Sequence, residues 1–465
     1  MTAWRPRRTH EDLGDVFFDR VAAARFPQLT LRYRNVRAAA SVGLDGLSDA
    51  DWLRHFGAFE PLPGSLDVPL ALRYHGHQFQ NYNPDLGDGR GFLFAQLEDL
   101  KNGRLLDLGT KGSGRTPWSR GGDGRLTLKG GVREVLATSM LEALGVNTSK
   151  SLSLIETGEE LERHDEPSPT RGSVLVRLSH SHIRIGTFQR LDALGETEAM
   201  ARLVDHALKH YYPALWDDAA TDKAERLLGA VAESVAETGA RWIAAGFVHG
   251  VLNTDNINIT GESFDYGPWR FLPTYDPAFT AAYFDQSGLY AFSRQPDALA
   301  WTLTRFAEVL LPLGDHAGLE AALNRFWPAF QRGLRLALLD RLGIESQGDE
   351  TDMALVEDVF RFLYQSQMGY ERFFFDWRGA DAARADRTSA YLGAEFAPLR
   401  AALTSYRARP DARLDHAYFA RSAPRTMLIE DMEALWAPIA ERDDWTAFHA
   451  ALDEIEMMRQ AYSAG

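Results

Sequence analysis

The sequence predicts an α+β protein with two lobes, a strand-rich lobe over residues 1–190 and a largely helical lobe over residues 191–465. Three observations lead to this prediction. Short apolar runs of strand type flank an Asn-Gly turn before residue 180. Helical periodicity of apolar residues begins near residue 196 and resumes almost to the end of the chain. The chain has 465 residues, 45% of them apolar, which is enough for two or three domains or lobes.

In the first lobe, residues 92–100 and 104–110 are two apolar runs separated by Asn102-Gly103, which is a strong hairpin signal. Residues 130–146 then carry apolar side chains at helical spacing and end at a glycine. Residues 151–157 and 173–179 read as another pair of strands, with an exposed polar loop between them. This lobe is therefore expected to hold a sheet and one central helix.

The second lobe reads as helix over residues 196–247 and again over most of the chain after residue 295. The strongest helical segments there are residues 297–311, 321–342, 355–374 and 443–458. A short polar loop, residues 249–267, interrupts the pattern near the beginning of this lobe.

Composition excludes several classes of site. The formal net charge of −15 and the pI of about 5.4 disfavour nucleic-acid binding. The chain has no cysteine, so disulfides, Cys-ligated zinc and thiol catalysis are excluded. No secretory signal and no apolar run long enough to span a membrane is recognised, so the expected location is cytoplasmic.

The first chemical motif combines glycines, a lysine and a glutamate. Gly87 and Gly89 lie in GDGRG beside Arg90, directly before a strand, where glycines would let backbone N–H groups approach phosphate. Lys111 ends the second hairpin strand, and Glu134 lies in the first turns of the helix that follows. Taken singly, the glycines could form a simple tight turn and the charges could be surface residues. Their order, however, is that of a protein-kinase N-lobe, which extends the prediction to a kinase-like bilobal fold with extra C-terminal helices.

The loop 249–267, HGVLNTDNINITGESFDYG, concentrates oxygen ligands. Asn256 and Asp265 suit Mg²⁺, which takes one or two ligands from protein and the rest from water and phosphate. We expect residues 257–266 to form a hairpin around Gly261 that brings the two side chains face to face. Asp255 is then the remaining carboxylate and the candidate proton acceptor, although NTDN is also good turn chemistry. His249 reads as a packing and hydrogen-bonding residue.

Further charged residues accompany these motifs. Asp123 and Gly124 lie in SRGGDGR, a loop that could close over a nucleotide. Arg177 and Arg184 lie near the lobe boundary and would suit a triphosphate, since arginine binds phosphate in a bidentate manner. Exposed strand-end arginines are an equally good reading of residue type alone. The pair His75 and His77 has no third ligand at useful spacing and reads as structural.

The spacing differs from that of an ordinary protein kinase. There, four residues separate the catalytic Asp from the metal-binding Asn, whereas Asp255 and Asn256 are adjacent here, and Gly250 replaces the usual Arg after His. The metal-binding part is therefore retained, while the part that handles the acceptor hydroxyl is rebuilt.

Together these segments resemble the selenoprotein O family, pseudokinases that act as protein adenylyltransferases. The matching segments are YHGHQFQNYNPDLGDGRG, TKGSGRTPWSRGGDGR, REVL, RGSVLVRLSHSHIRIGTFQ and HGVLNTDNINITGESFDYGPWRFL, between about residues 70 and 300. The resemblance fades after about residue 400. Many members carry a cysteine or selenocysteine near the C-terminus, and this chain has neither, so no redox-regulated bridge is expected.

The resemblance implies a kinase-like fold that binds ATP in an inverted orientation, so that AMP is transferred to a Ser, Thr or Tyr hydroxyl of a protein. It implies Mg²⁺ or Mn²⁺ on Asn256 and Asp265, Asp255 as proton acceptor, and a supporting ion pair between Glu134 and Lys111. UTP, and hence UMP transfer, stays open. Neither nucleic acid nor membrane is an expected partner. The implied nucleotide-binding residues are Gly87, Gly89, Arg90, Lys111, Asp123, Gly124, Arg177, Arg184 and Asp265.

Two other functions stay open at this point. A phosphotransferase of kinase-like fold, acting on small molecules or proteins, can also use a His-Gly catalytic loop and a nearby metal-binding Asp. A non-catalytic pseudokinase would bind ATP as a switch. The adjacent Asp255 and Asn256, together with Arg177 and Arg184, favour nucleotidyl transfer, and the intact pair of metal ligands disfavours the switch.

Overall fold

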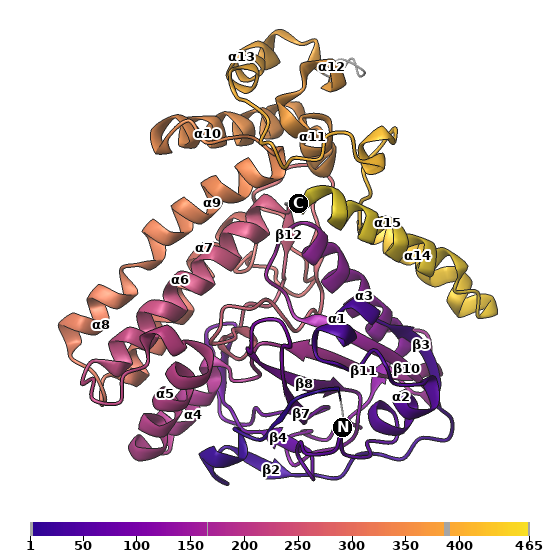
Figure 1. Cartoon of the computed structure of the whole chain (residues 1–465), viewed down its shortest axis with the longest axis vertical. Helices are drawn as coiled ribbons and strands as arrows, with labels where there is room; N and C mark the ends of the chain where they lie inside the picture. The colour runs from indigo at the N-terminus through magenta and orange to yellow at the C-terminus, as the bar shows by residue number, and fades with distance from the viewer. Residues whose placement is uncertain (1–2, 165, 386–390, 464–465) are drawn as a thin grey trace.

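The computed structural model describes residues 3–164, 166–385 and 391–463. It is a mixed α/β structure in which the strands of the large sheet all come before residue 180 and helices dominate the rest (Figure 1). Within the described ranges, no helix is long and apolar enough to cross a membrane.

Strands of the described residues form one large antiparallel sheet in the order β2-β4-β7-β8-β11-β10-β3, with β1 paired to β7 and β9 to β11. The predicted hairpin is confirmed, because β7 and β8 pair antiparallel on either side of the Asn102-Gly103 turn. The strands of this sheet are β1 Pro6–Arg7, β2 Phe18–Arg20, β3 Thr30–Arg34, β4 Leu70–Leu72, β7 Leu93–Glu98, β8 Leu105–Lys111, β9 Leu126–Thr127, β10 Lys150–Leu161 and β11 Thr170–Ser179. Two small two-stranded sheets consist of β5 Gly76–Gln78 with β6 Asn81–Asn83, and β12 Phe247–Val248 with β13 Arg270–Phe271.

Successive side chains of each strand point to opposite faces of the sheet. Both faces are apolar, and helices cover both of them. Leu154 and Leu175 belong to the core that includes helix α3 (Leu128–Ala143). Ile155, Val174 and Val176 point to the other face and join a second core with α1 (Val36–Ser41) and α2 (Asp49–Phe56). The predicted central helix 130–146 is thus α3, which begins at the N-cap Thr127.

The second half of the chain packs helices around the long helix α6, which contacts α5, α7, α8 and α9. Helix α10 lies between Gly348 and Gln367, which both have positive φ, and Gly369 precedes α11. The predicted helical segment 355–374 therefore forms parts of two helices. The helices are α4 Ile185–Ala193, α5 Thr197–Tyr211, α6 Lys223–Ala244, α7 Gln295–Leu310, α8 His316–Leu323, α9 Phe326–Leu342, α10 Asp349–Ser366, α11 Tyr370–Asp376, α12 Ala382–Ala385, α13 Ala397–Ser405, α14 Ile429–Arg442 and α15 Thr446–Tyr462.

The last two helices return to the sheet half of the molecule. Helix α15 packs along α3, and α14 touches α3 as well (Figure 1). Helix α3 therefore lies between the sheet and the C-terminal end of the chain.

Two sequence expectations about local structure are wrong. The loop between β10 and β11 is shorter than expected, because β10 continues to Leu161 and β11 already begins at Thr170. The segment 257–266 does not form a hairpin with itself. Asn258 forms an isolated bridge with Arg184, and Ser263 forms one with Thr148, because both sides of the segment find backbone partners in neighbouring segments instead.

Candidate active site

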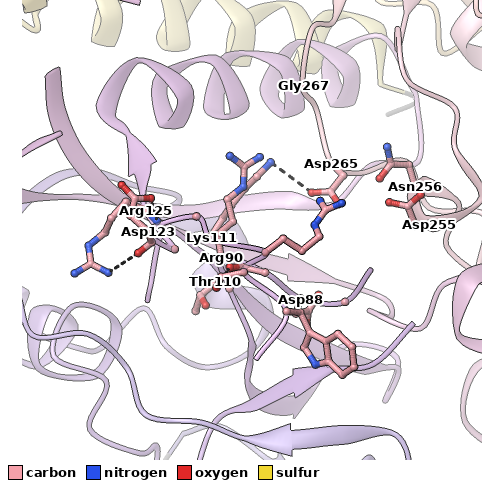
Figure 2. A pocket seen from close by; sticks show the side chains of 18 of the residues that line it. Asp88, Arg90, Thr110, Lys111, Asp123, Arg125, Asp255, Asn256, Asp265 and Gly267 are labelled. Carbon is pink, nitrogen blue, oxygen red and sulfur yellow. Dashed lines mark hydrogen bonds and ion pairs between the residues drawn. The ribbon is translucent and has the colours of Figure 1, made fainter. Parts of the chain in front are cut away.

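A cavity of about 820 Å³ opens between the sheet and the segment 251–268. Figure 2 places Asp255, Asn256 and Asp265 on one side of it, Asp123 and Arg125 on the other, and Lys111 and Arg90 between them. Its volume is in the range of small-molecule sites. All of the sequence-predicted nucleotide, metal and proton-acceptor residues line it, namely Gly87, Gly89, Arg90, Lys111, Asp123, Gly124, Arg177, Arg184, Asp255, Asn256 and Asp265.

Asp265 is the electrostatic centre of the cavity. Its Oδ1 accepts a hydrogen bond from Arg177 Nη1 at 2.7 Å and lies 3.4 Å from Lys111 Nζ, and its Oδ2 accepts from Arg184 Nη1 at 2.7 Å. Burial opposes ionisation of this carboxyl, but the two arginines and the lysine outweigh it and hold the pKa of Asp265 well below its usual value. We call this group of four residues the Asp265 clasp.

The members of the clasp come from separate parts of the chain. Lys111 ends β8, Arg177 lies on the adjacent strand β11, and Arg184 is the N-cap residue of α4. Asp265 has φ of +63°, a left-handed conformation that aspartate tolerates better than most residues. This backbone conformation is part of how the segment presents the carboxylate to the three cations.

Glu134 does not line the cavity but supports it from behind. It lies in the second turn of α3, is 1% exposed, and forms an ion pair with Lys111. Its Oε2 is buried without a hydrogen-bond partner among the described residues. Lys111 is thus held between a carboxylate of the sheet half and the carboxylate of Asp265.

Asp255 lies in a short 3₁₀ turn, Thr254–Asn256, and is 7% exposed. Its Oδ1 is buried and has no hydrogen-bond partner in the described part of the chain. Burial raises the pKa of Asp255 to about 6, although the charge of Arg184 acts in the opposite direction. An ionised oxygen of this kind is well suited to accept a proton.

Asn256 and Asp265 supply the oxygens that could hold a metal ion. Asn256 Nδ2 donates to Val251 O at 3.0 Å, which orients the amide, and its Oδ1 has no hydrogen-bond donor among the residues that the structure describes. Among residues 3–164, 166–385 and 391–463, no group of three or more His, Asp or Glu side chains is arranged to hold a metal. Two protein oxygens fit Mg²⁺ or Mn²⁺ bound together with a nucleotide, because such ions take their remaining ligands from phosphate and water.

Backbone pairing explains how this loop is fixed without a hairpin. Ile185 N donates to Ile257 O at 3.0 Å, and Ile259 N donates to Ile183 O at 3.1 Å. On the other side, Ser263 N donates to Asn147 O at 2.9 Å. The loop is therefore attached both to the segment before α4 and to the segment before β10, and the two attachments together position Asp255 and Asp265.

The glycine-rich loop is covered by Trp118 and Ser119, two residues to which the sequence analysis assigned no role. A Cβ on Gly87 would lie 2.4 Å from Trp118 Cγ, and one on Gly89 would lie 2.8 Å from Trp118 O. Ser119 Oγ donates to Gly89 O at 2.6 Å, and the Trp118 indole donates to Asp19. Close packing against Trp118 is thus a second reason for glycine here, one that residue type could not separate from phosphate binding.

Asp123 at the far rim accepts hydrogen bonds from Arg163 at 2.8 and 3.2 Å, and these bonds overcome partial burial to lower the pKa of Asp123. Arg163 was missed because it lies in a segment read as a loop. Asp88, also missed, is a partly buried neighbour of Arg184 within the GDGRG motif, and desolvation raises the pKa of its carboxyl. Arg120, exposed and without an ion-pair partner among the described residues, lies within SRGGDGR and could have been found there.

The histidines noted in the sequence have hydrogen-bond partners. His75 Nδ1 lies 2.6 Å from Tyr82 Oη, and His77 Nδ1 lies 2.9 Å from Gln189 Nε2. His249 is fully buried, with Nε2 3.0 Å from Phe264 O. These contacts agree with structural roles.

Comparison with known proteins places nearly the whole chain in one family. A family model described as protein adenylyltransferase SelO matches residues 3–456. The expectation that the resemblance fades near residue 400 is therefore wrong, because the match to the family model continues to residue 456. The C-terminal helices carry no short polar motif by which the similarity could be seen in the sequence.

Bacterial relatives match over nearly their whole length. A protein of Trichormus variabilis named protein nucleotidyltransferase YdiU is 43% identical over 468 residues, which cover 96% of this chain and 94% of the relative. A protein of the same name from Synechocystis sp. is 44% identical, and the aligned region covers 96% of this chain and 96% of the relative. A namesake from Mycobacterium sp. is 36% identical and covers 92% of this chain. The chain belongs to the protein adenylyltransferase SelO family.

Proposed function

We propose that this protein transfers AMP from ATP to Ser, Thr or Tyr hydroxyls of other proteins in a reaction that depends on Mg²⁺ or Mn²⁺. The observation that carries the proposal is the 3.4 Å approach of Lys111 Nζ to Asp265 Oδ1, which joins the sheet half and the helical half of the molecule at one cavity wall. Family membership supplies the reaction class. UTP remains the alternative nucleotide.

In this proposal the Asp265 clasp exchanges partners when the nucleotide binds. Lys111, Arg177 and Arg184 turn from Asp265 toward the phosphates, with Gly87, Gly89 and Arg90 contributing from the glycine-rich loop. Asp123 and Gly124 contact the nucleotide from the opposite rim. The exchange avoids leaving a buried charge unpaired, which would cost several kcal/mol.

The proposed chemical step gives each of these side chains a role. The acceptor hydroxyl oxygen attacks the α-phosphorus, the bond from that phosphorus to the bridging oxygen breaks, and pyrophosphate leaves. Asp255 accepts the hydroxyl proton, and its pKa of about 6 keeps it largely ionised at neutral pH. Asn256 and Asp265 would hold the metal ion, whose charge, when it is bound, offsets that of the phosphates.

The proposal extends to the architecture. We infer a protein-kinase-like bilobal fold with an N-terminal lobe over residues 1–190 and a C-terminal lobe over residues 191–465. The confinement of the large sheet to residues before 180 supports this division. An inverted nucleotide, with its α-phosphate toward Asp255, is required for AMP transfer.

Labelled ATP tests the reaction. The protein is incubated with a divalent metal, a cell lysate, and ATP labelled at the α or the γ phosphorus. Label entering protein from α-labelled ATP alone is the expected result. Transfer of γ label alone would establish a phosphotransferase and refute the proposal, and ATP binding without transfer of either label would favour a nucleotide-dependent switch.

A further inference from the structure

A pair of aromatic side chains is exposed near the catalytic loop. Tyr283 is 88% exposed and Phe284 is 47% exposed, and their ring centroids are 5.1 Å apart. They lie in the connection between β13 and α7, outside the cavity described above. Adjacent exposed aromatic rings are costly in water and commonly mark an interaction surface.

The turn that carries this pair is well built. Asp285 N donates to Ala282 O at 3.1 Å, closing a tight turn around the two aromatic residues. The Asp285 side chain is buried and accepts from Leu289 N at 2.9 Å and from Tyr290 N at 2.8 Å. The rings are thus presented outward by an ordered turn, which limits the conformational entropy lost when they bind something.

The same turn is connected to the residue that we propose as proton acceptor. Phe79, at the tip of the β5–β6 hairpin, lies 5.9 Å from Phe284 and 5.0 Å from Tyr290, measured between ring centroids. Asn253 Oδ1 accepts from Phe79 N at 3.1 Å and from Tyr290 Oη at 2.9 Å. Asn253 is only two residues from Asp255. It therefore connects the aromatic residues Phe79 and Tyr290 to the turn 254–256 that carries Asp255.

The neighbourhood of the pair indicates what it can bind. Exposed residues beside it on the two turns, Gln80, Asn81, Gln286 and Ser287, are polar but uncharged. One cation is close by: Arg294 Nη1 donates to Ser287 O and Gly288 O, each at 3.2 Å. Arg177 and Arg184, the arginines proposed to bind the phosphates, line the cavity, whereas Tyr283 and Phe284 do not. The paired rings and the uncharged side chains beside them fit an apolar side chain, and Arg294 Nη1 is already engaged by the carbonyls of the turn.

We propose that Tyr283, Phe284 and Phe79 form a docking surface for an apolar side chain of the acceptor protein, close in sequence to the hydroxyl that is modified. This inference rests on the proposed function, because it concerns the polypeptide that brings its hydroxyl to Asp255. The acceptor backbone on one side of the hydroxyl has to leave the cavity past the catalytic loop, where these rings lie. The surface therefore selects acceptors by their flanking residues.

Short synthetic peptides that differ only beside a central Ser, Thr or Tyr test the surface. One set carries Leu or Phe at flanking positions, a second carries Asp, and a third carries Lys. Transfer from α-labelled ATP is measured for the wild-type protein, for the double variant Tyr283→Ser/Phe284→Ser, and for the control Tyr364→Ser. Tyr364 is 59% exposed on α10, and neither the cavity nor the aromatic surface includes it.

The wild-type protein is expected to prefer the apolar set. The double variant should raise KM for that set by about tenfold, the effect of losing one good contact, and leave kcat and ATP affinity unchanged. The Tyr364→Ser control should match the wild type. The conservative exchange Tyr283→Phe/Phe284→Tyr should keep the preference, which shows that loss of the rings, rather than misfolding, is responsible.

Equal use of all three peptide sets by the wild type, or an unchanged KM in the double variant, would overturn the inference while leaving the proposed function intact. A dimer seen by light scattering in the wild type and lost in the double variant would also overturn it, because a second copy would then occupy the surface. If no peptide and no lysate protein received α label, the proposed function itself would fail, and this inference with it.

Discussion

At the residue scale, the Asp265 clasp determines how charge is balanced in the cavity. Arg177 and Arg184 are both 3% exposed, and their charges are balanced chiefly by the partly buried carboxylate of Asp265. Asp88 lies 3.6 Å from Arg184 and gives weaker compensation. Arginine does not lose its proton, so removing Asp265 leaves buried cations with too few partners.

Replacing Asp265 with Ala should abolish metal-dependent transfer and leave the fold intact. It should also lower the unfolding free energy of the ligand-free protein by about 3–5 kcal/mol, the usual effect of breaking a buried ion pair. Urea denaturation measures this loss. Pyrophosphate should restore more stability to the variant than it adds to the wild type, because phosphate would replace the missing carboxylate. Full activity in the variant would refute the metal assignment.

A second residue-scale prediction concerns Asp255. Asp255→Asn preserves side-chain size but removes the proton acceptor, so transfer should fall by a factor of about 10²–10⁴. ATP affinity should change little, because no charged contact to the phosphates is removed. Calorimetric titration with ATP separates the two effects. A variant that retained transfer would show that a different group, or water, accepts the proton.

A third prediction concerns acid stability. His10 is buried, with both ring nitrogens unpartnered among the described residues, and burial lowers its pKa to about 4. The unfolded chain, with an ordinary His pKa near 6.5, takes up a proton that the folded protein refuses. Stability should therefore fall as the pH drops from 6.5 toward 4, by up to about 3 kcal/mol from this group.

His10→Phe is the matched variant, because it keeps an aromatic ring beside Phe18. Its urea midpoint should depend less on pH between 4 and 6.5 than that of the wild type. The remaining pH dependence should be considerable, because burial also lowers the pKa of His206, whose ring lies 6.3 Å from that of His10. Identical pH profiles of wild type and variant would contradict the assignment.

At the scale of elements, α3 is held from two sides. Its apolar side packs on β10 and β11, and its outer side is covered by α14 and α15. Arg133 lies 3.8 Å from the sulfur of Met432 on α14 and donates to Gly267 O at 3.2 Å. The C-terminal helices thus support the same helix that positions Glu134 against Lys111.

Met432→Ala should reveal this support. Met432 is fully buried, and removing such a side chain typically costs about 2–5 kcal/mol. The exposed ion pair between Lys129 and Glu433 joins the same two helices, so Lys129→Ala is the control and should cost less than about 1 kcal/mol. Chemical denaturation compares the two variants. Equal effects would indicate that the α3–α14 contact contributes little through packing.

At the scale of the whole molecule, charge is unevenly distributed. The chain carries a formal net charge of −15, yet basic side chains outnumber acidic ones among the described residues that line the cavity. The chain can therefore attract a polyphosphate locally while repelling large polyanions overall. The cavity forms where the sheet half and the helical half meet, so ligand binding should stabilise the two together.

ATP with Mg²⁺ should consequently raise the stability of the whole protein. At a ligand concentration of about 100 times Kd, the expected gain is about 2.7 kcal/mol. AMP should give a smaller gain at the same concentration, because it offers fewer phosphate oxygens to Lys111, Arg177 and Arg184. Thermal unfolding with each nucleotide measures the difference. Equal shifts with ATP and AMP would show that the clasp does not bind the outer phosphates.

The sequence by itself predicted the local structure that depends on short-range patterns. The β7–β8 hairpin, the helix α3 and the helical second half follow from spacing, turn residues and apolar periodicity, which act within a few residues. The identities of the cavity residues also came from the sequence, because motif order and resemblance restrict which residue types can serve a nucleotide and a metal.

Only the tertiary structure decided how distant segments pair. It showed that the two sides of the segment 257–266 pair with residues at the start of α4 and before β10 rather than with one another as a hairpin. It also showed that Asp265 holds three cations and that α14 and α15 cover α3. It also brought Phe79 and Phe284, which lie far apart along the chain, onto one surface. Such contacts depend on which buried groups satisfy one another after the chain folds, and periodicity along the chain carries no information about that choice.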